Sequence, residues 1–159
     1  MRSAGALPIK LHAEALFPTH GWSVSYTGEM PKVLVIEDDP VLAQLTTYVL
    51  EREGIETATA SDGPSGLAAI AELRPEVVIV DLTLPGMPGD EVCRRVRRDP
   101  RFAHTHLIIV SAVDESEGRR RAREAGADAF VCKPCDPDRV VVAVREGFAG
   151  RAASAASAS

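Results

Sequence analysis

Short apolar runs that alternate with longer helical stretches are the feature that most limits what this chain can fold into. Four apolar runs have the length of buried strands: residues 33–36, 77–80, 107–110 and 129–132. A fifth, more polar run at 55–60 is expected to form an edge strand. Because helical stretches separate these runs, the strands can bury both faces only in a parallel sheet flanked by helices. The expected fold class is therefore α/β, doubly wound.

The predicted helices differ in the apolar surface they offer to such a sheet. The first carries a stripe of Val41, Leu42, Leu45, Tyr48 and Val49, and the last a stripe of Val140, Val141, Val144 and Phe148. Both are expected to pack firmly. The helix at 114–125 offers little beyond Ala122 and Ala125, which four arginines surround. It is expected to be the most loosely held helix and a candidate moving part.

The two ends of the chain lack these patterns. Residues 1–31 are expected to be an N-terminal extension, either flexible or the result of a misassigned start upstream of Met30. The alternative is a functional extension that packs through Phe17, Trp22 and Tyr26. Residues 149–159, rich in Ala and Ser, are expected to form a flexible tail. This leaves 32–148 as the folded domain.

Charge and composition argue against several classes of protein. The formal net charge of -5 is unlike that of a general nucleic-acid binder. No apolar run approaches the ~20 residues of a membrane-spanning helix, and no signal peptide is recognised. The cysteines, Cys93, Cys132 and Cys135, are too few for a disulfide scaffold. A cytoplasmic protein is expected, with no direct nucleic-acid contact and no membrane insertion.

Polar residues stand where four of the predicted strands end: Glu37, Asp38 and Asp39 after the first, Asp81 after the third, Ser111 after the fourth and Lys133-Pro134 after the fifth. Such strand ends share one edge of the sheet, where ligands bind. Gathered carboxylates repel one another unless a cation neutralises them, and oxygen ligands suit Mg²⁺. A hydroxyl and an ammonium group suit phosphate oxygens. The pattern indicates phosphoryl chemistry, with Asp39 better explained as a helix cap.

These motifs, in this order and spacing, resemble the response-regulator receiver family over about residues 32–148. The resemblance rests on Glu37-Asp38, Asp81 within the segment 77–86, Ser111-Ala112 and Lys133-Pro134. It implies a flavodoxin-like (βα)5 fold with five parallel strands in the order 2-1-3-4-5. It also implies a signalling domain of a two-component or phosphorelay system. Such a domain is not an enzyme, although it assists its own phosphorylation and dephosphorylation.

The resemblance further implies a role for each residue of the site. Asp81 would take a phosphoryl group from a sensor histidine kinase or a histidine phosphotransfer protein, as an aspartyl phosphate. The implied Mg²⁺ ligands are Asp38, Asp81, the backbone carbonyl of Thr83 and, directly or through water, Glu37. Lys133 and Ser111 would contact the phosphoryl group. The bond between Lys133 and Pro134 is expected to be cis.

The same family likeness implies a switch. Movement of the Ser111 hydroxyl toward a phosphate oxygen would open space for the ring of Phe130. A population shift would then alter the face formed by the fourth helix, fifth strand and fifth helix, where a downstream protein target would bind. Thr83 and Val113 flank the site and are expected to tune the lifetime of the phosphate.

Other functions fit parts of the sequence less well. The spacing of Cys132 and Cys135 raises thiol–disulfide exchange, but the pair follows the last strand. His104 and His106 form an H-x-H pair that is more often a loop feature than a metal site. A haloacid-dehalogenase-like phosphatase also uses an aspartyl nucleophile, but Thr83 stands where its second acid belongs. The expectation is a stand-alone receiver, with a fragment of a longer regulator or a phosphorylation-independent interaction module as alternatives.

Overall fold

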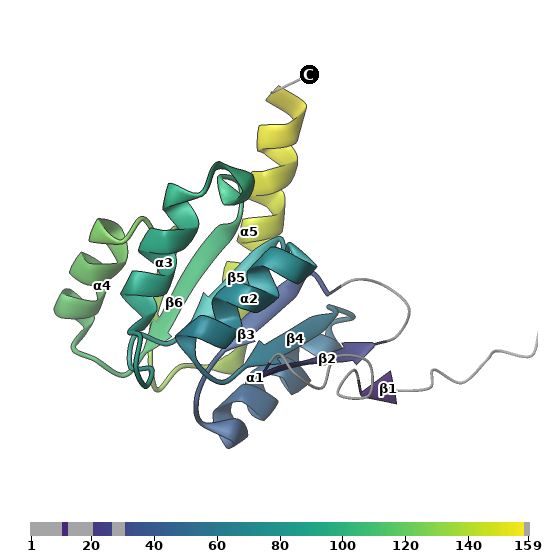
Figure 1. The fold of residues 1–159 in the computed structure, drawn as a ribbon, viewed down its shortest axis with the longest axis horizontal. Coiled ribbons are helices and arrows are strands. Elements are labelled where there is room, and N and C mark those ends of the chain that lie inside the picture. The colour runs from purple at the N-terminus through teal and green to yellow at the C-terminus, as the bar shows by residue number, and fades with distance from the viewer. Residues whose placement is uncertain (1–10, 13–20, 27–30, 158–159) are drawn as a thin grey trace, which may run out of the picture.

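The parallel sheet predicted from the sequence is the centre of the computed structural model, which describes residues 11–12, 21–26 and 31–157 (Figure 1). Its parallel strands are β3 (Val33–Ile36), β4 (Thr57–Ala60), β5 (Val77–Val80), β6 (His106–Ser111) and β7 (Ala129–Cys132). They lie side by side in the order β4-β3-β5-β6-β7. Numbered by themselves along the chain, these strands follow the predicted order 2-1-3-4-5, and the fold class is confirmed.

Helices cover both faces of this sheet. Helices α1 (Pro40–Arg52) and α5 (Pro137–Ser157) lie on one face, while α2 (Gly63–Leu73), α3 (Gly89–Arg98) and α4 (Glu115–Glu124) lie on the other; a 3-10 turn, η2 (Pro100–Phe102), follows α3 (Figure 1). Alternate strand residues point to opposite faces. Thus Leu34 and Val78 belong to the core under α2 and α3, whereas Val33 and Val77 belong to the core under α1 and α5.

The first helix begins as the sequence predicts. The Asp39 side chain accepts hydrogen bonds from the backbone N–H groups of Val41 and Leu42, which satisfies two donors that the helix leaves free. Asp62 and Asp114 cap α2 and α4 in the same way. These caps fix where each helix begins relative to the strand end before it.

The N-terminal residues add to the sheet, which the sequence did not predict. Strand β2 (Trp22–Tyr26) pairs antiparallel with β4, and β1 (Leu11–His12) pairs antiparallel with β2. The predicted edge position of 55–60 is therefore wrong, because β4 has a neighbour on each side. Trp22 is buried in the core under α2. For this residue, the alternative of an extension that packs on the domain is therefore correct. Phe17 and Met30 lie outside the described residues.

Two helices differ from their predictions. Most of the apolar stripe on α1 faces solvent, because α1 packs on the sheet through Ala43, Val49 and Leu50 while the side chains of Leu45 and Tyr48 are 52% and 57% exposed. The expected firm packing of that stripe was wrong. At the other end, α5 continues through Ser157 where a flexible tail was expected. Alanine favours extension of a helix that has already formed.

Within the described part of the chain, no helix combines the length and the apolar character that crossing a membrane requires.

Candidate functional site

Three carboxylates gather at the ends of β3 and β5. Asp81 follows β5, and its backbone N–H donates to the carbonyl of Ile36 at 3.1 Å, which places it beside the residues that follow β3. Glu37 and Asp81 are each 8% exposed, whereas Asp38 is exposed. Oxygen atoms of these three side chains lie within 4.8 Å of one another. The predicted acidic pocket is thus present in the structure.

Lys133 reaches this pocket from the end of β7. Its ammonium nitrogen lies 2.7 Å from Oε2 of Glu37 and 2.9 Å from Oδ2 of Asp81. Its backbone N–H donates to the carbonyl of Ser111 at 2.8 Å, so β6 and β7 together position the lysine. The peptide bond to Pro134 is cis, as predicted. Four strand ends therefore meet, as expected for a doubly wound sheet.

The balance of charge favours binding of a cation. Burial raises the pKa of Glu37, and its hydrogen bond with Lys133 offsets that effect only in part. Burial alone would lower the pKa of Lys133, but its hydrogen bonds to Glu37 and Asp81 outweigh this, and the pKa is raised. One ammonium group thus faces three acids, and their oxygens are the ligands that Mg²⁺ prefers. The residues present fit a magnesium ion.

Ser111 ends β6 and Thr83 follows Asp81 by two residues, so both stand at the strand ends that form the pocket. The Ser111 hydroxyl is fully buried and has no hydrogen-bond partner among the described residues. An unsatisfied buried hydroxyl is costly, so it is suited to meet an incoming oxygen. The backbone N–H of Thr83 donates to Oδ1 of Asp81 at 2.9 Å. The proposed ligand role of the Thr83 carbonyl stays a prediction.

Gly89 belongs to this site, although sequence reasoning read it only as a helix start. A side-chain carbon at position 89 would lie 2.0 Å from the carbonyl oxygen of Asp81. Its backbone N–H also donates to the carbonyl of Leu82 at 3.0 Å. Glycine therefore allows α3 to begin directly against the backbone of Asp81. A glycine after a turn-forming segment is a signal that could have indicated such a close approach.

Several other candidates do not join the cluster. Asp39 caps α1, as argued from the sequence, and its backbone N–H donates to Oε1 of Glu37. Cys132 and Cys135 line two different pockets, one beside α4 and β7 and one beside α1, which does not favour a redox pair. Among the described residues, Glu37, Asp38 and Asp81 are the one group of three metal-binding side chains, and the pair His104 and His106 lies outside it.

Comparison with known protein families identifies the family to which this chain belongs. Residues 33–145 match the model of the response regulator receiver domain. The chain belongs to the response regulator receiver family. Membership removes the haloacid-dehalogenase alternative, because the acidic pair, Asp81, Ser111 and Lys133 stand at strand ends of a receiver fold.

Individual relatives agree with this membership. The receiver is 41% identical over 114 residues to the DNA-binding response regulator MtrA of Mycolicibacterium smegmatis, a match over 72% of this chain and 49% of MtrA. A CheY-like receiver domain protein from Methanospirillum hungatei has a TM-score of 0.73 and 25% identity, with 79% and 99% of the two chains covered. A putative response regulator from Chloroflexus aurantiacus has a TM-score of 0.71 and 31% identity, with 75% and 98% covered. This chain spans about half the length of the MtrA relatives it matches.

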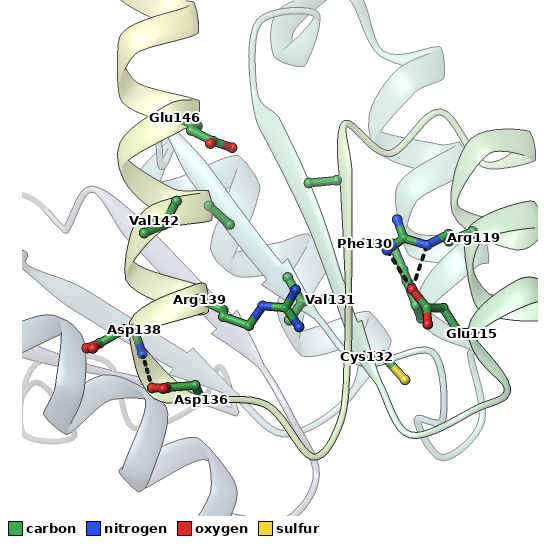
Figure 2. Close-up of a pocket in the computed structure, with 12 residues that line it drawn as sticks. Glu115, Arg119, Phe130, Val131, Cys132, Asp136, Asp138, Arg139, Val142 and Glu146 are labelled. Atoms are coloured by element: carbon green, nitrogen blue, oxygen red, sulfur yellow. Dashed lines mark hydrogen bonds and ion pairs between the residues drawn. The ribbon is translucent and has the colours of Figure 1, made fainter.

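The predicted switch residue of the receiver, Phe130, lies on β7 against α4. A side-chain carbon at Gly118 would come within 2.2 Å of the ring, and the Arg119 guanidinium stacks over it at 5.7 Å. Figure 2 shows Phe130 and Arg119 on one side of a pocket and Arg139 and Asp138, both from α5, on the other. The pocket measures about 370 Å³. It lies on the predicted output face.

Proposed function

We propose that this receiver takes a phosphoryl group onto Asp81 from a phosphohistidine of a sensor kinase or a histidine phosphotransfer protein. The observation that carries this proposal is the contact of Lys133 with both Asp81 and Glu37 inside a pocket of three carboxylates. In the receiver family such a pocket is suited to an aspartyl nucleophile that is oriented by a lysine. The module would be a signalling domain rather than an enzyme acting on a separate substrate.

The reaction is a phosphoryl transfer between two side chains. A carboxylate oxygen of Asp81 forms a bond to phosphorus while the bond between phosphorus and the donor's imidazole nitrogen breaks. The imidazole leaves with that electron pair and is protonated by solvent. Mg²⁺, held by Glu37, Asp38, Asp81 and the backbone carbonyl of Thr83, would supply charge neutralisation when bound.

Two other side chains would meet the transferred group. The Lys133 ammonium, which already touches Asp81, would shift to a phosphoryl oxygen. The buried hydroxyl of Ser111 would donate to another oxygen and so gain the partner that the described residues do not give it. Thr83 and Val113, which the family likeness places beside the nucleophile, would tune hydrolysis.

The exposed stripe of α1 fits the docking of a phosphodonor. Leu42 and Leu45 line an apolar pocket of about 400 Å³, and Lys133 and Pro134 line the same pocket. A donor helix with an apolar face could cover this surface and bring its phosphohistidine beside the lysine. A Leu45→Glu variant should then lose transfer from the donor while its reaction with acetyl phosphate is unchanged. Equal loss of both reactions would contradict docking at α1.

Phosphorylation would change the face formed by α4, β7 and α5, where a downstream protein would bind. Inward movement of the Phe130 ring would follow movement of the Ser111 hydroxyl and would remove the ring from its contact with Gly118. The cytoplasm is the proposed location, since the phosphodonors of such systems draw on ATP. This chemistry holds whether the receiver acts alone or within a longer regulator.

Intact-protein mass spectrometry after incubation with acetyl phosphate and magnesium tests the proposed function. The native chain should gain one phosphoryl group of about 80 Da. Asp81→Asn should gain none, nor should the native chain after magnesium is removed. If the native chain gains no phosphoryl group even when hydrolysis is trapped, the receiver works as a phosphorylation-independent interaction module.

A further inference from the structure

A partly buried ion pair joins α3 to α4 close to the carboxylate cluster. Asp90, the second residue of α3, is 6% exposed. Nε of Arg121, on α4, donates to its Oδ2 at 3.1 Å. Nη2 of Arg121 lies 3.0 Å from Oδ1, an ion-pair contact that lacks hydrogen-bond geometry. Arg94 adds a second cation at 3.1 Å.

Little apolar surface holds α4 in place. The buried residues within α4 are Gly118 and Ala122, which offer small apolar surfaces. Arg121 lies three residues after Gly118 and next to Ala122, so it belongs to the same inner face of the helix. A partly buried ion pair contributes modestly to net stability, and Asp90 keeps Arg94 as a partner when Arg121 is lost. The pair therefore defines where α4 sits more than how stable the domain is.

The same pair is connected to the phosphoacceptor through the backbone. Asp90 directly follows Gly89, whose Cα packs against the carbonyl of Asp81. The first turn of α3 thus has the phosphoacceptor on one side and the carboxylate that binds Arg121 on the other. A displacement of the Asp81 segment would reach α4 through the contact of Asp90 with Arg121.

We propose that Asp90 and Arg121 form a latch that holds α4 against α3 in the described position. The latch also regulates Asp81, because it opposes the rearrangement of α4 that accompanies phosphorylation. This regulatory role rests on the proposed function. Weak apolar packing leaves α4 free to move, and the ion pair selects one of its positions.

Hydrogen–deuterium exchange of the unphosphorylated full chain tests the latch. Arg121→Met should speed exchange of the α4 amides by about tenfold or more, with β5 and β6 unchanged. The matched control is Arg120→Met, which removes a neighbouring arginine whose ion pairs with Glu117 and Glu124 lie on the surface. It should change α4 exchange by less than about twofold. Equal exchange in the two variants would overturn the latch.

A second, nearly isosteric variant tests the latch independently of whether Arg121→Met folds. Asp90→Asn keeps the shape of the side chain and removes its charge, and it should also release α4. The double variant should exchange no faster than the faster single variant, because both changes remove the same contact between Asp90 and Arg121. Additive effects would show that the residues act separately and would refute the pair as a unit.

Phosphorylation provides the regulatory measurement. If the latch opposes the phosphorylated state, the Asp90→Asn and Arg121→Met variants should gain a phosphoryl group from acetyl phosphate about threefold faster than native, while Arg120→Met matches native. Faster exchange of α4 without faster phosphorylation would refute the regulatory role. No phosphorylation of the native chain would contradict the proposed function instead, and the exchange result would still decide the latch.

Discussion

The ammonium nitrogen of Lys133 lies 2.9 Å from Oδ2 of Asp81, although the two residues are 52 positions apart in the chain. The same nitrogen contacts Glu37 at 2.7 Å. Lys133 is thus a positive charge on two of the carboxylates that would hold Mg²⁺. A bound Mg²⁺ and Lys133 would therefore share carboxylates.

Replacing Lys133 with methionine should strengthen magnesium binding. Removal of a positive charge beside the carboxylates should tighten the dissociation constant by about three- to tenfold, or about 1 kcal/mol, as measured by isothermal titration calorimetry. The same variant should phosphorylate poorly, because no ammonium meets the phosphoryl oxygens. Lys32→Met is the control, since Lys32 is exposed and precedes the opposite end of β3. Weaker magnesium binding in Lys133→Met would contradict this account.

The raised pKa of Glu37 predicts a pH dependence of stability. The folded state holds the Glu37 proton more tightly than the unfolded state does, because burial disfavours the carboxylate. The contribution of this protonated carboxyl to folding stability is fully present below the ordinary pKa of 4.5, and it is lost as pH rises through the raised pKa of the folded state. Without magnesium, Glu37→Gln should therefore gain stability relative to native between pH 4.5 and neutrality, as measured by urea denaturation.

A matched variant and added metal make the pH prediction sharper. Glu72→Gln changes an exposed glutamate on α2 and should follow the native profile. Saturating Mg²⁺ should favour the native chain, because the ion binds the ionised form of Glu37. Parallel profiles of Glu37→Gln and native at every pH would show that burial of this carboxyl has no energetic effect.

The space around Gly118 and Gly150 predicts opposite effects on stability when each is replaced by alanine. A methyl group at 118 would meet the ring, so Gly118→Ala should destabilise the fold by about 1–3 kcal/mol. Gly150→Ala has open space and should stabilise α5 by about 0.5–1 kcal/mol. Chemical denaturation measures both. In a Phe130→Ala background the change at 118 should no longer destabilise; if it still does, the ring is not the obstacle.

The burial of Trp22 predicts that strand β2 contributes to the stability of the folded domain. Its side chain packs in the core under α2, so Trp22→Ala should cost about 3 kcal/mol in urea denaturation. A chain that begins at Met30 should lose at least as much, and Trp22→Phe should lose less. Equal stability of the full and shortened chains would favour the start at Met30.

The sequence predicts the strand ends well because short β-branched runs can only be buried strands here, and parallel strands bring their ends together. Glu37, Asp81 and Lys133 meet for that reason. Periodicity on α1 reveals an apolar face but not its direction, so Leu45 was placed in the core although it faces solvent. The role of Asp90 was also missed, because its partner Arg121 is 31 residues away and only tertiary structure joins them.

The most direct test of the central claim is to locate the phosphoryl group. After incubation with acetyl phosphate and magnesium, the chain is reduced with borohydride, which converts an acyl phosphate to an alcohol, then digested and sequenced by tandem mass spectrometry. A reduced side chain at Asp81 that depends on magnesium is the predicted result. Reduction at Asp38 or elsewhere, with Asp81 unmodified, would contradict the account.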